Sequence, residues 1–183
     1  MSKIPSIETA RLILRPFSAT DLEPLAEILA DPDVVRFLPN SEPRTSSQTE
    51  GILNYIHNHW TDYGFGWWAM VHKADQKLVG WCGLKIFDHT SDVELLYLLA
   101  KAYWGQGLTT EAAGAALHFG FEELGLKRIV AFAVPENKAS TRVMEKVGMQ
   151  YEKAGRFYNL DGVCYAIDRT AYQLTPSFYQ LHR

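Results

Sequence analysis

The sequence predicts one α/β (α+β) domain built on a mixed, mostly antiparallel sheet flanked by helices. Its 183 residues suit one domain with a sizeable core. A content of 47% hydrophobic and 21% charged residues is typical of soluble globular proteins and unlike disordered, collagen-like or coiled-coil chains. Strand and helix patterns follow in the order β-α-α-β-β-β-α-β-α-β-β. Because neither repeats nor a Gly/Ser/Pro linker interrupt this order, residues 1–183 are expected to form a single domain.

The first third of the chain contains one expected strand and two expected helices. Residues Arg11–Arg15 form a short apolar strand that Pro16 ends. Thr20–Glu23 matches a capping box, and apolar residues follow it at helical spacing. Residues 31–47 hold three prolines and are predicted to be a loop, before a helix over Gln48–Tyr63.

The middle and the end of the chain supply the remaining elements. Three strands, Trp67–Val71, Leu78–Phe87 and Val93–Leu99, suggest an antiparallel meander. A helix to about Leu124, a buried strand at Arg128–Val134, a helix at Asn137–Val147 and a hairpin of Tyr151–Tyr158 with Val163–Tyr172 are predicted next. Gly114 and Gly120 would each cost the first of these helices roughly 1 kcal/mol relative to Ala, so tertiary packing must stabilise it.

Charge and cysteine content exclude several functions. A net charge of -3 and a pI of about 6.1 argue against nucleic-acid binding, which needs a basic surface. Cys82 and Cys164 lie in apolar segments without the spacing of a zinc site, so we expect buried free thiols and no metal. The sequence has neither a long apolar run nor the apolar core of a signal peptide. We therefore expect a cytoplasmic protein with no membrane partner.

The most informative motif is a glycine-rich turn that opens a helix. Gly105-Gln106-Gly107-Leu108-Thr109-Thr110 follows the strand Val93–Leu99. Backbone N–H groups at a helix N-terminus are unsatisfied and attract anions, and glycines let a phosphate approach them closely. Glycines also serve tight turns that bind nothing, so the motif alone leaves both interpretations open.

Two other nucleotide-binding motifs do not fit this turn. A dinucleotide-binding fingerprint needs a third glycine, and Thr110 occupies that position. A Walker loop needs Gly-Lys-Ser/Thr, which is absent from the sequence. The turn is therefore expected to bind a pyrophosphate of another kind, if it binds a ligand.

Taken together, the motifs resemble those of the Gcn5-related N-acetyltransferases (GNAT), in the branch of the ribosomal-protein N-terminal (Rim-type) enzymes. The resemblance runs from Glu8–Phe17, which is similar to the opening of that branch, to the closing hairpin. It implies a sheet that splays at its centre, between the strands Val93–Leu99 and Arg128–Val134. It also implies acetyl-CoA as co-substrate.

The resemblance also implies which residues bind the co-substrate. Its pyrophosphate motif falls on Trp104-Gly105-Gln106-Gly107-Leu108-Thr109, continued by Thr110, with Trp104 and Thr109 in place of the usual residues. Its second motif falls on Asn137 and Ser140, which would face the ligand from a helix N-terminus, although an Asn there can equally be a plain cap. Pantetheine would pair with the backbone of Tyr97, Leu98 and Leu99 as an added strand does.

The implied chemistry is direct attack of an amine on the thioester in a ternary complex. Glu94 is the expected base, acting through water, and Glu152 is a weaker candidate. The tyrosine that protonates the leaving thiolate elsewhere in the family corresponds to Met144, so Ser140 is the expected substitute. His57 and His59 are two residues apart on a helix and point different ways, so they are not expected to bind a metal together, and His118 is expected to be a surface or packing residue.

The sequence thus predicts an N-acetyltransferase that acts on a primary amine. Deprotonating an α-amine at pH 7 costs roughly 1.4 kcal/mol and a lysine nearly 5 kcal/mol, which favours a protein N-terminus as acceptor. A small-molecule amine, such as a polyamine, antibiotic or metabolite, is the alternative. A non-catalytic acyl-CoA-binding sensor is a third hypothesis. The tail Thr175–Arg183 is expected either to pack on its own chain or to contact a second copy in a homodimer.

Overall fold

The computed structural model describes residues 4–87, 91–173 and 178–183. Within these ranges the strands form one nine-stranded sheet in the order β7-β8-β6-β5-β4-β3-β2-β1-β9. All neighbouring strands are antiparallel except β5 and β6. The strands are β1 (Ser6–Thr9), β2 (Leu12–Arg15), β3 (Trp67–His72), β4 (Lys77–Ile86), β5 (Val93–Leu99), β6 (Arg128–Ala133), β7 (Gln150–Phe157), β8 (Leu160–Asp168) and β9 (Tyr179–His182).

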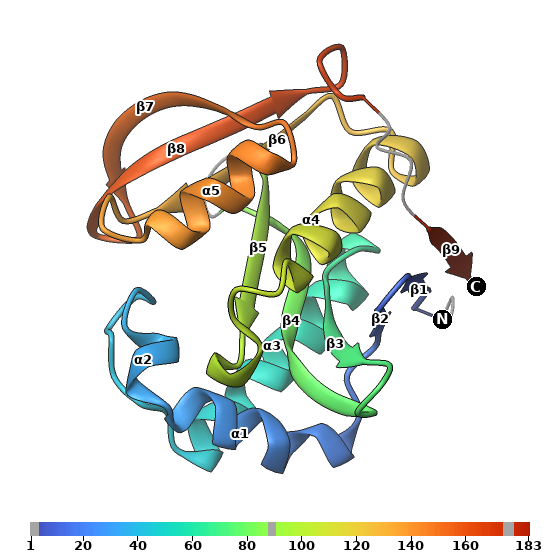
Figure 1. Cartoon of the computed structure of the whole chain (residues 1–183), viewed down its shortest axis with the longest axis vertical. Helices are drawn as coiled ribbons and strands as arrows, with labels where there is room; N and C mark the ends of the chain where they lie inside the picture. The colour runs from blue at the N-terminus through green and yellow to red at the C-terminus, as the bar shows by residue number, and fades with distance from the viewer. Residues whose placement is uncertain (1–3, 88–90, 174–177) are drawn as a thin grey trace.

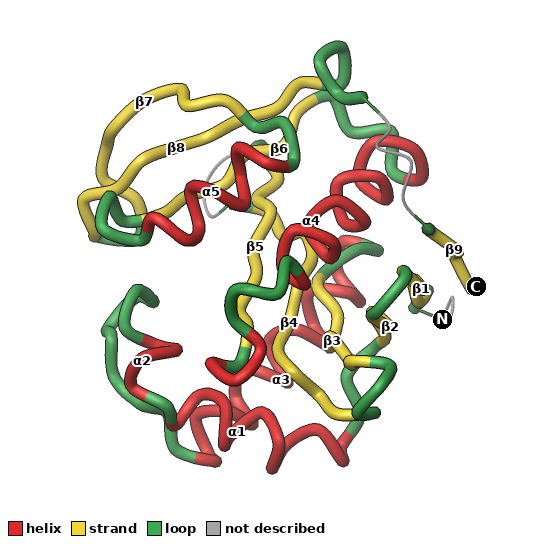
Figure 2. Tube along the Cα trace, in the orientation of Figure 1, coloured by secondary structure: helices red, strands yellow, loops and turns green. Residues whose placement is uncertain are grey.

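Helices cover both faces of this sheet. They are α1 (Leu22–Ala30), α2 (Pro32–Val35), α3 (Ser46–Tyr63), α4 (Leu108–His118) and α5 (Lys138–Lys146), with short turns at Ala19–Asp21 and Lys101–Tyr103. Figures 1 and 2 show α4 and α5 on the near face and α3 behind the sheet. Helix α4 packs on β4 and β5, and α1 packs on α3 and β4. The predicted mixed α/β class and helix-flanked sheet are confirmed.

The core lies between α4 and the central strands. Leu108, Ala112 and Ala116 recur at helical spacing on α4, and all three are fully buried. Trp68 of β3 packs edge-on against Phe119, which begins a π-helical turn (Phe119–Glu123) that continues α4. The predicted extent of this helix is therefore correct, but its last turn is not α-helical.

The sheet splays between β5 and β6, as expected. These parallel strands pair only through Val93 with Ile129 and Glu94 with Val130. Beyond Glu94, β5 continues to Leu99 beside β4 alone. One edge of the second half of β5 therefore faces a gap rather than a neighbouring strand.

Three elements were not predicted from the sequence. Strand β1 precedes the expected first strand, and four residues are too few to show a periodic pattern. Helix α2 lies inside the expected loop 31–47, where the Asp31 side chain accepts a hydrogen bond from the N–H of Asp33 and Pro32 begins the helix. Strand β9 pairs with β1, so the described part of the expected tail packs on its own chain; residues 174–177 lie outside the described ranges.

Two glycines should respond oppositely to alanine. A Cβ at Gly114, inside α4, would meet no atom within 4 Å, so Gly114→Ala should raise the free energy of unfolding by about 1 kcal/mol. A Cβ at Gly83 of β4 would lie 2.2 Å from the Cα of Trp67, so Gly83→Ala should lower that free energy by about 3 kcal/mol. Urea unfolding of both variants measures the two free energies of unfolding. Equal changes in the two variants would contradict the close packing of Gly83 against Trp67 and the open space at Gly114.

No helix within the described ranges combines the length and the apolar character needed to cross a membrane.

Candidate active site

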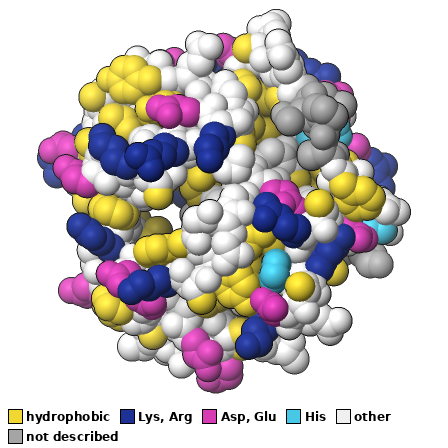
Figure 3. Space-filling model, viewed as in Figure 1, with side chains coloured by type: hydrophobic (Ala, Val, Ile, Leu, Met, Phe, Trp, Pro, Cys, Tyr) yellow, Lys and Arg dark blue, Asp and Glu magenta, His cyan; other side chains and the backbone are white. Residues whose placement is uncertain are grey.

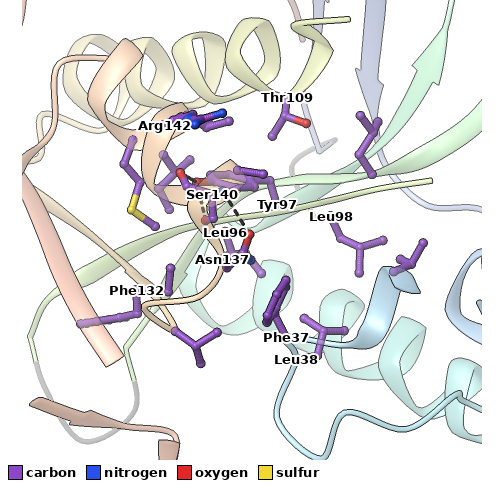
Figure 4. A pocket seen from close by; sticks show the side chains of 18 of the residues that line it. Phe37, Leu38, Leu96, Tyr97, Leu98, Thr109, Phe132, Asn137, Ser140 and Arg142 are labelled. Atoms are coloured by element: carbon purple, nitrogen blue, oxygen red, sulfur yellow. Dashed lines mark hydrogen bonds between the residues drawn. The ribbon is translucent and has the colours of Figure 1, made fainter. Parts of the chain in front are cut away.

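A cavity of about 600 Å³ opens at the splayed centre of the sheet. Its walls come from β4, β5 and β6, the turn before α4, helix α5, α2 with the segment after it, and the turn between β7 and β8. Figure 3 shows this face of the molecule hollowed, with hydrophobic side chains inside the hollow and Lys and Arg side chains nearby. Figure 4 places Phe37 and Leu38 on one side of the cavity and Thr109 and Arg142 on the other.

The expected cofactor residues lie together around this cavity, with one exception. Lining residues from this set are Tyr97, Leu98, Leu99, Trp104, Gly105, Gly107, Leu108, Thr109, Thr110, Asn137 and Ser140. Gln106 does not line it: its side chain donates a hydrogen bond to the Ala102 carbonyl, 3.3 Å away. The Trp104 indole donates to the Leu99 carbonyl at 2.7 Å, which turns the ring toward β5.

The glycine turn presents backbone amides to the cavity. Gly105 and Gly107 have φ values of 74° and 77°, a left-handed conformation that favours glycine. The first helical hydrogen bond of α4 runs from the N–H of Glu111 to the carbonyl of Gly107. The amides of Leu108, Thr109 and Thr110 therefore precede the helical ladder, and a helix leaves such groups available to an anion.

Helix α5 approaches the same cavity with its N-terminus. Asn137 caps it, since its Oδ1 accepts a hydrogen bond from the N–H of Ser140 at 3.2 Å. The plain capping role considered for Asn137 is therefore real, and Asn137 also lines the cavity. Arg142 and Lys146, one helical turn apart, line the cavity as well and add positive charge.

The hydroxyl groups of Tyr97 and Ser140 meet inside the cavity. Tyr97 donates to the Ser140 carbonyl at 3.0 Å, and its oxygen lies 2.9 Å from Ser140 Oγ. Burial raises the pKa of the Tyr97 hydroxyl well above its usual value, so the group is protonated at neutral pH. Met144, at the position of the missing tyrosine, is buried and has no ionisable group.

Glu94 lies on the same cavity, at the last paired position of β5 and β6. Its side chain is 8% exposed, and the Tyr158 hydroxyl donates a short hydrogen bond to its Oε2. Lys85, opposite Glu94 on β4, has its Nζ 3.9 Å from the same oxygen and 4.7 Å from the centre of the Tyr158 ring. Glu94 Oε2 therefore has a hydroxyl donor and a nearby cation as partners on the cavity wall.

Sequence reasoning missed several residues of this site, and three of them show why. Lys85 had a signal, because a lysine inside an otherwise apolar strand needs a reason to be buried. Arg142 follows the Asn137 motif by little more than one helical turn, and that spacing also could have indicated it. Tyr158 had no such signal, since it lies at a turn where its φ is +52°.

The remaining candidates have structural partners. His59 is buried, with Nδ1 2.8 Å from the Phe65 carbonyl and Nε2 accepting from the Ile86 N–H, which makes it neutral. Glu152 pairs with Arg128, and burial raises the pKa of the Cys82 thiol. No group of three or more potential metal ligands occurs in the described part of the chain.

Comparison with known proteins is consistent with this arrangement. The family model "Acetyltransferase (GNAT) domain" matches residues 11–150. YkkB of Bacillus subtilis is 33% identical over 154 residues, which is 82% of this chain and 88% of YkkB. The FsC-acetyl coenzyme A-N(2)-transacetylase of Aspergillus fumigatus is 30% identical over 156 residues, 80% of this chain and 66% of that protein.

Solved structures give the same result. The crystal structure of a GNAT-family acetyltransferase from Bacillus anthracis has a TM-score of 0.77 and 30% sequence identity. The match covers 90% of this chain and 99% of that one. The chain therefore belongs to the GNAT family, and it is an acyltransferase that uses acetyl-CoA for N-acetylation.

Proposed function

We propose that this enzyme acetylates a neutral primary α-amine, such as the N-terminus of a polypeptide, that is carried on an apolar group. One observation carries the proposal: a single cavity joins the amide-lined turn before α4 to the buried carboxylate of Glu94. Acetyl transfer needs an anion site and a proton acceptor on the two sides of one thioester.

The residues around the cavity fit coenzyme A. A diphosphate suits the N–H groups of Leu108, Thr109 and Thr110, and Gly107 leaves space there because a Cβ would meet only the Arg11 side chain, at 3.6 Å. Arg142 adds charge of the required sign. The unpaired edge of β5, from Tyr97 to Leu99, offers backbone groups to the amides of pantetheine, apart from the Leu99 carbonyl, which accepts a hydrogen bond from the Trp104 indole.

Acetyl transfer then needs a proton acceptor for the amine. The amine nitrogen attacks the thioester carbon, the C–N bond forms, and the C–S bond breaks with its electron pair passing to sulfur. The nitrogen loses one proton, which a water molecule carries to the Glu94 carboxylate. Lys85 and the Tyr158 hydroxyl hold this carboxylate in position for that task.

The leaving thiolate takes one proton from the Ser140 hydroxyl. Ser140 regains a proton from the Tyr97 hydroxyl, whose oxygen lies 2.9 Å from Ser140 Oγ, and Tyr97 regains one from water. In the resting arrangement Tyr97 donates to the Ser140 carbonyl at 3.0 Å, so the Ser140 proton can turn toward sulfur. A thiolate with a pKa near 8.5 is a moderate leaving group, so the gain is modest.

Ser140→Ala should therefore reduce kcat about tenfold or less. Tyr97→Phe should have a similar effect, and the double variant should not exceed either single variant greatly, because both hydroxyls act in one relay. Steady-state kinetics at saturating acetyl-CoA measures this. Strictly multiplicative effects would contradict a shared relay.

Apolar side chains shape the acceptor end of the cavity. Phe37 and Leu38 come from the segment after α2, and Phe157 and Leu160 come from the turn between β7 and β8. These walls favour an acceptor whose amine is flanked by apolar groups. An α-amine also loses its proton at neutral pH more readily than a lysine does.

A thiol-release assay over matched amine panels tests the proposed function. Acetyl-CoA would be supplied together with one of three kinds of amine. The first panel contains peptides with a free N-terminal Ser, Ala, Leu or Phe, and the second contains the same peptides blocked at the N-terminus but carrying lysine. The third contains small polyamines. We expect turnover on the free N-termini, with mass spectrometry placing the acetyl group on the α-nitrogen. Turnover on small amines alone would show that the acceptor is a small-molecule amine and not a polypeptide N-terminus. Binding of acetyl-CoA without turnover on any amine would favour a sensor.

A further inference from the structure

An ionic network joins the N-terminal hairpin to the glycine turn. The Arg11 side chain lies between two parts of this turn: Nε donates to Glu111 Oε2 at 2.7 Å, and Nη1 donates to the Gln106 carbonyl at 2.8 Å. The Arg11 main-chain N–H donates to the other oxygen of Glu111 at 2.8 Å. One residue thus holds the turn on both sides of Gly107.

The bond to the Gln106 carbonyl fixes the direction of a neighbouring amide. In a trans peptide, the carbonyl of one residue and the N–H of the next point in opposite directions. Because Arg11 holds the Gln106 carbonyl, the N–H of Gly107 points away from Arg11, and the carbonyl oxygen cannot turn toward an anion in the cavity. Gly107 lines that cavity.

The ion pair between Arg11 and Glu111 compensates a negative charge close to the proposed diphosphate site. Glu111 lies in the first turn of α4, next to the amides proposed to bind a diphosphate, and its side chain is 13% exposed. Burial raises its pKa, but hydrogen bonds from Thr9 and from the Arg11 backbone and side chain outweigh burial and lower the pKa overall. Glu111 is therefore ionised, and without Arg11 its charge would repel a phosphate.

The network rests on a buried support. Thr9 is 2% exposed, and its hydroxyl lies 2.7 Å from Glu111 Oε1 and 3.1 Å from the N–H of Leu12, which donates to it. The turn between β1 and β2 is thereby locked against α4, so Arg11 starts from a fixed backbone position.

We propose that Arg11 is a positioning residue for the diphosphate of acetyl-CoA, acting through the Gln106 carbonyl and the Glu111 carboxylate. This inference rests on the proposed function, in which the turn before α4 binds that diphosphate. It predicts that Arg11 affects binding of the nucleotide half of acetyl-CoA and leaves the chemical step intact.

The test compares acetyl-CoA with acetyl-pantetheine, which carries the same thioester without the diphosphate. For Arg11→Ala we expect KM for acetyl-CoA to rise about 20-fold, with kcat within threefold and kcat/KM for acetyl-pantetheine unchanged. Arg11→Lys, which keeps the charge but cannot span both partners, should give an intermediate rise. Adding Glu111→Gln to Arg11→Ala should restore part of the lost affinity, because it removes the unpaired charge.

The control variant is Lys73→Ala, which perturbs the same hairpin without touching the turn. Lys73 donates to the Thr9 carbonyl and pairs with Glu8. We expect Lys73→Ala to lower thermal stability as much as Arg11→Ala does, with KM for acetyl-CoA unchanged. An equal rise of KM in the control, or an equal loss with acetyl-pantetheine, would overturn the inference.

A comparison of the two thioesters with the wild-type enzyme distinguishes failure of the proposed diphosphate site from failure of the proposed role of Arg11. If it does not prefer acetyl-CoA to acetyl-pantetheine, the diphosphate site of the proposed function is wrong and the role of Arg11 fails with it. If the wild type prefers acetyl-CoA and Arg11→Ala retains the full preference, only the role of Arg11 is wrong.

Discussion

Gly107→Glu should weaken acetyl-CoA binding at least 100-fold, which corresponds to about 2.7 kcal/mol. The residue occupies the N-cap of α4 with φ at +77°, so a glutamate there adopts a strained left-handed conformation. The carboxylate would also lie beside the amides of Leu108 and Thr109, where it would compete with the diphosphate for the same N–H groups. Isothermal titration calorimetry with acetyl-CoA measures the loss.

A neutral substitution at position 107 distinguishes the effect of the added negative charge from the effect of the added side chain. Gly107→Asn places a side chain in the same left-handed conformation, which asparagine tolerates well, but adds no charge. We expect it to weaken binding much less than Gly107→Glu does and to lower the unfolding temperature no more than Gly107→Glu does. Equal affinity of the wild type and Gly107→Glu would show that the diphosphate binds elsewhere.

The long periodic elements of this fold could be predicted from sequence because packing and local pattern agree in them. In α4, the apolar spacing of Leu108, Ala112 and Ala116 faces the sheet that buries it. Strand β1 and helix α2 span four residues each, too few to show a period. What stabilises β1 is pairing with β9, from the other end of the chain, and sequence patterns within β1 contain no trace of that partner.

The candidate site also contains parts that the sequence could predict and parts that it could not. The exposed backbone amides could be located, because glycines at 105 and 107 before a helix indicate where N–H groups have no helical partner. Side-chain partners that depend on tertiary contact could not. Tyr158 reaches Glu94 from 64 residues away, and Arg11 reaches Glu111 across 100 residues. The family resemblance places Met144 where a tyrosine is usual, but the Tyr97 hydroxyl beside Ser140 became evident only in the structure.

Glu94→Gln should reduce kcat by about 10² to 10³, the range expected when a positioned general base is lost. Glutamine has nearly the same shape as glutamate, so its side-chain oxygen still accepts the hydrogen bond from Tyr158 and the strand pairing of β5 is unchanged. It cannot accept the proton of the attacking amine. The KM for acetyl-CoA should therefore be unchanged, and the loss should appear in kcat with every accepted amine.

A second variant tests whether orientation of the carboxylate matters as well as its presence. Tyr158→Phe removes the hydroxyl that holds Glu94 Oε2 but keeps the ring against which Lys85 Nζ lies. Because the carboxylate remains while its donor is lost, we expect a smaller reduction of kcat, about tenfold. Steady-state kinetics at saturating acetyl-CoA and amine distinguishes the two variants by the size of the loss of kcat. A Tyr158→Phe variant that is as slow as Glu94→Gln would contradict a purely orienting role for the hydroxyl.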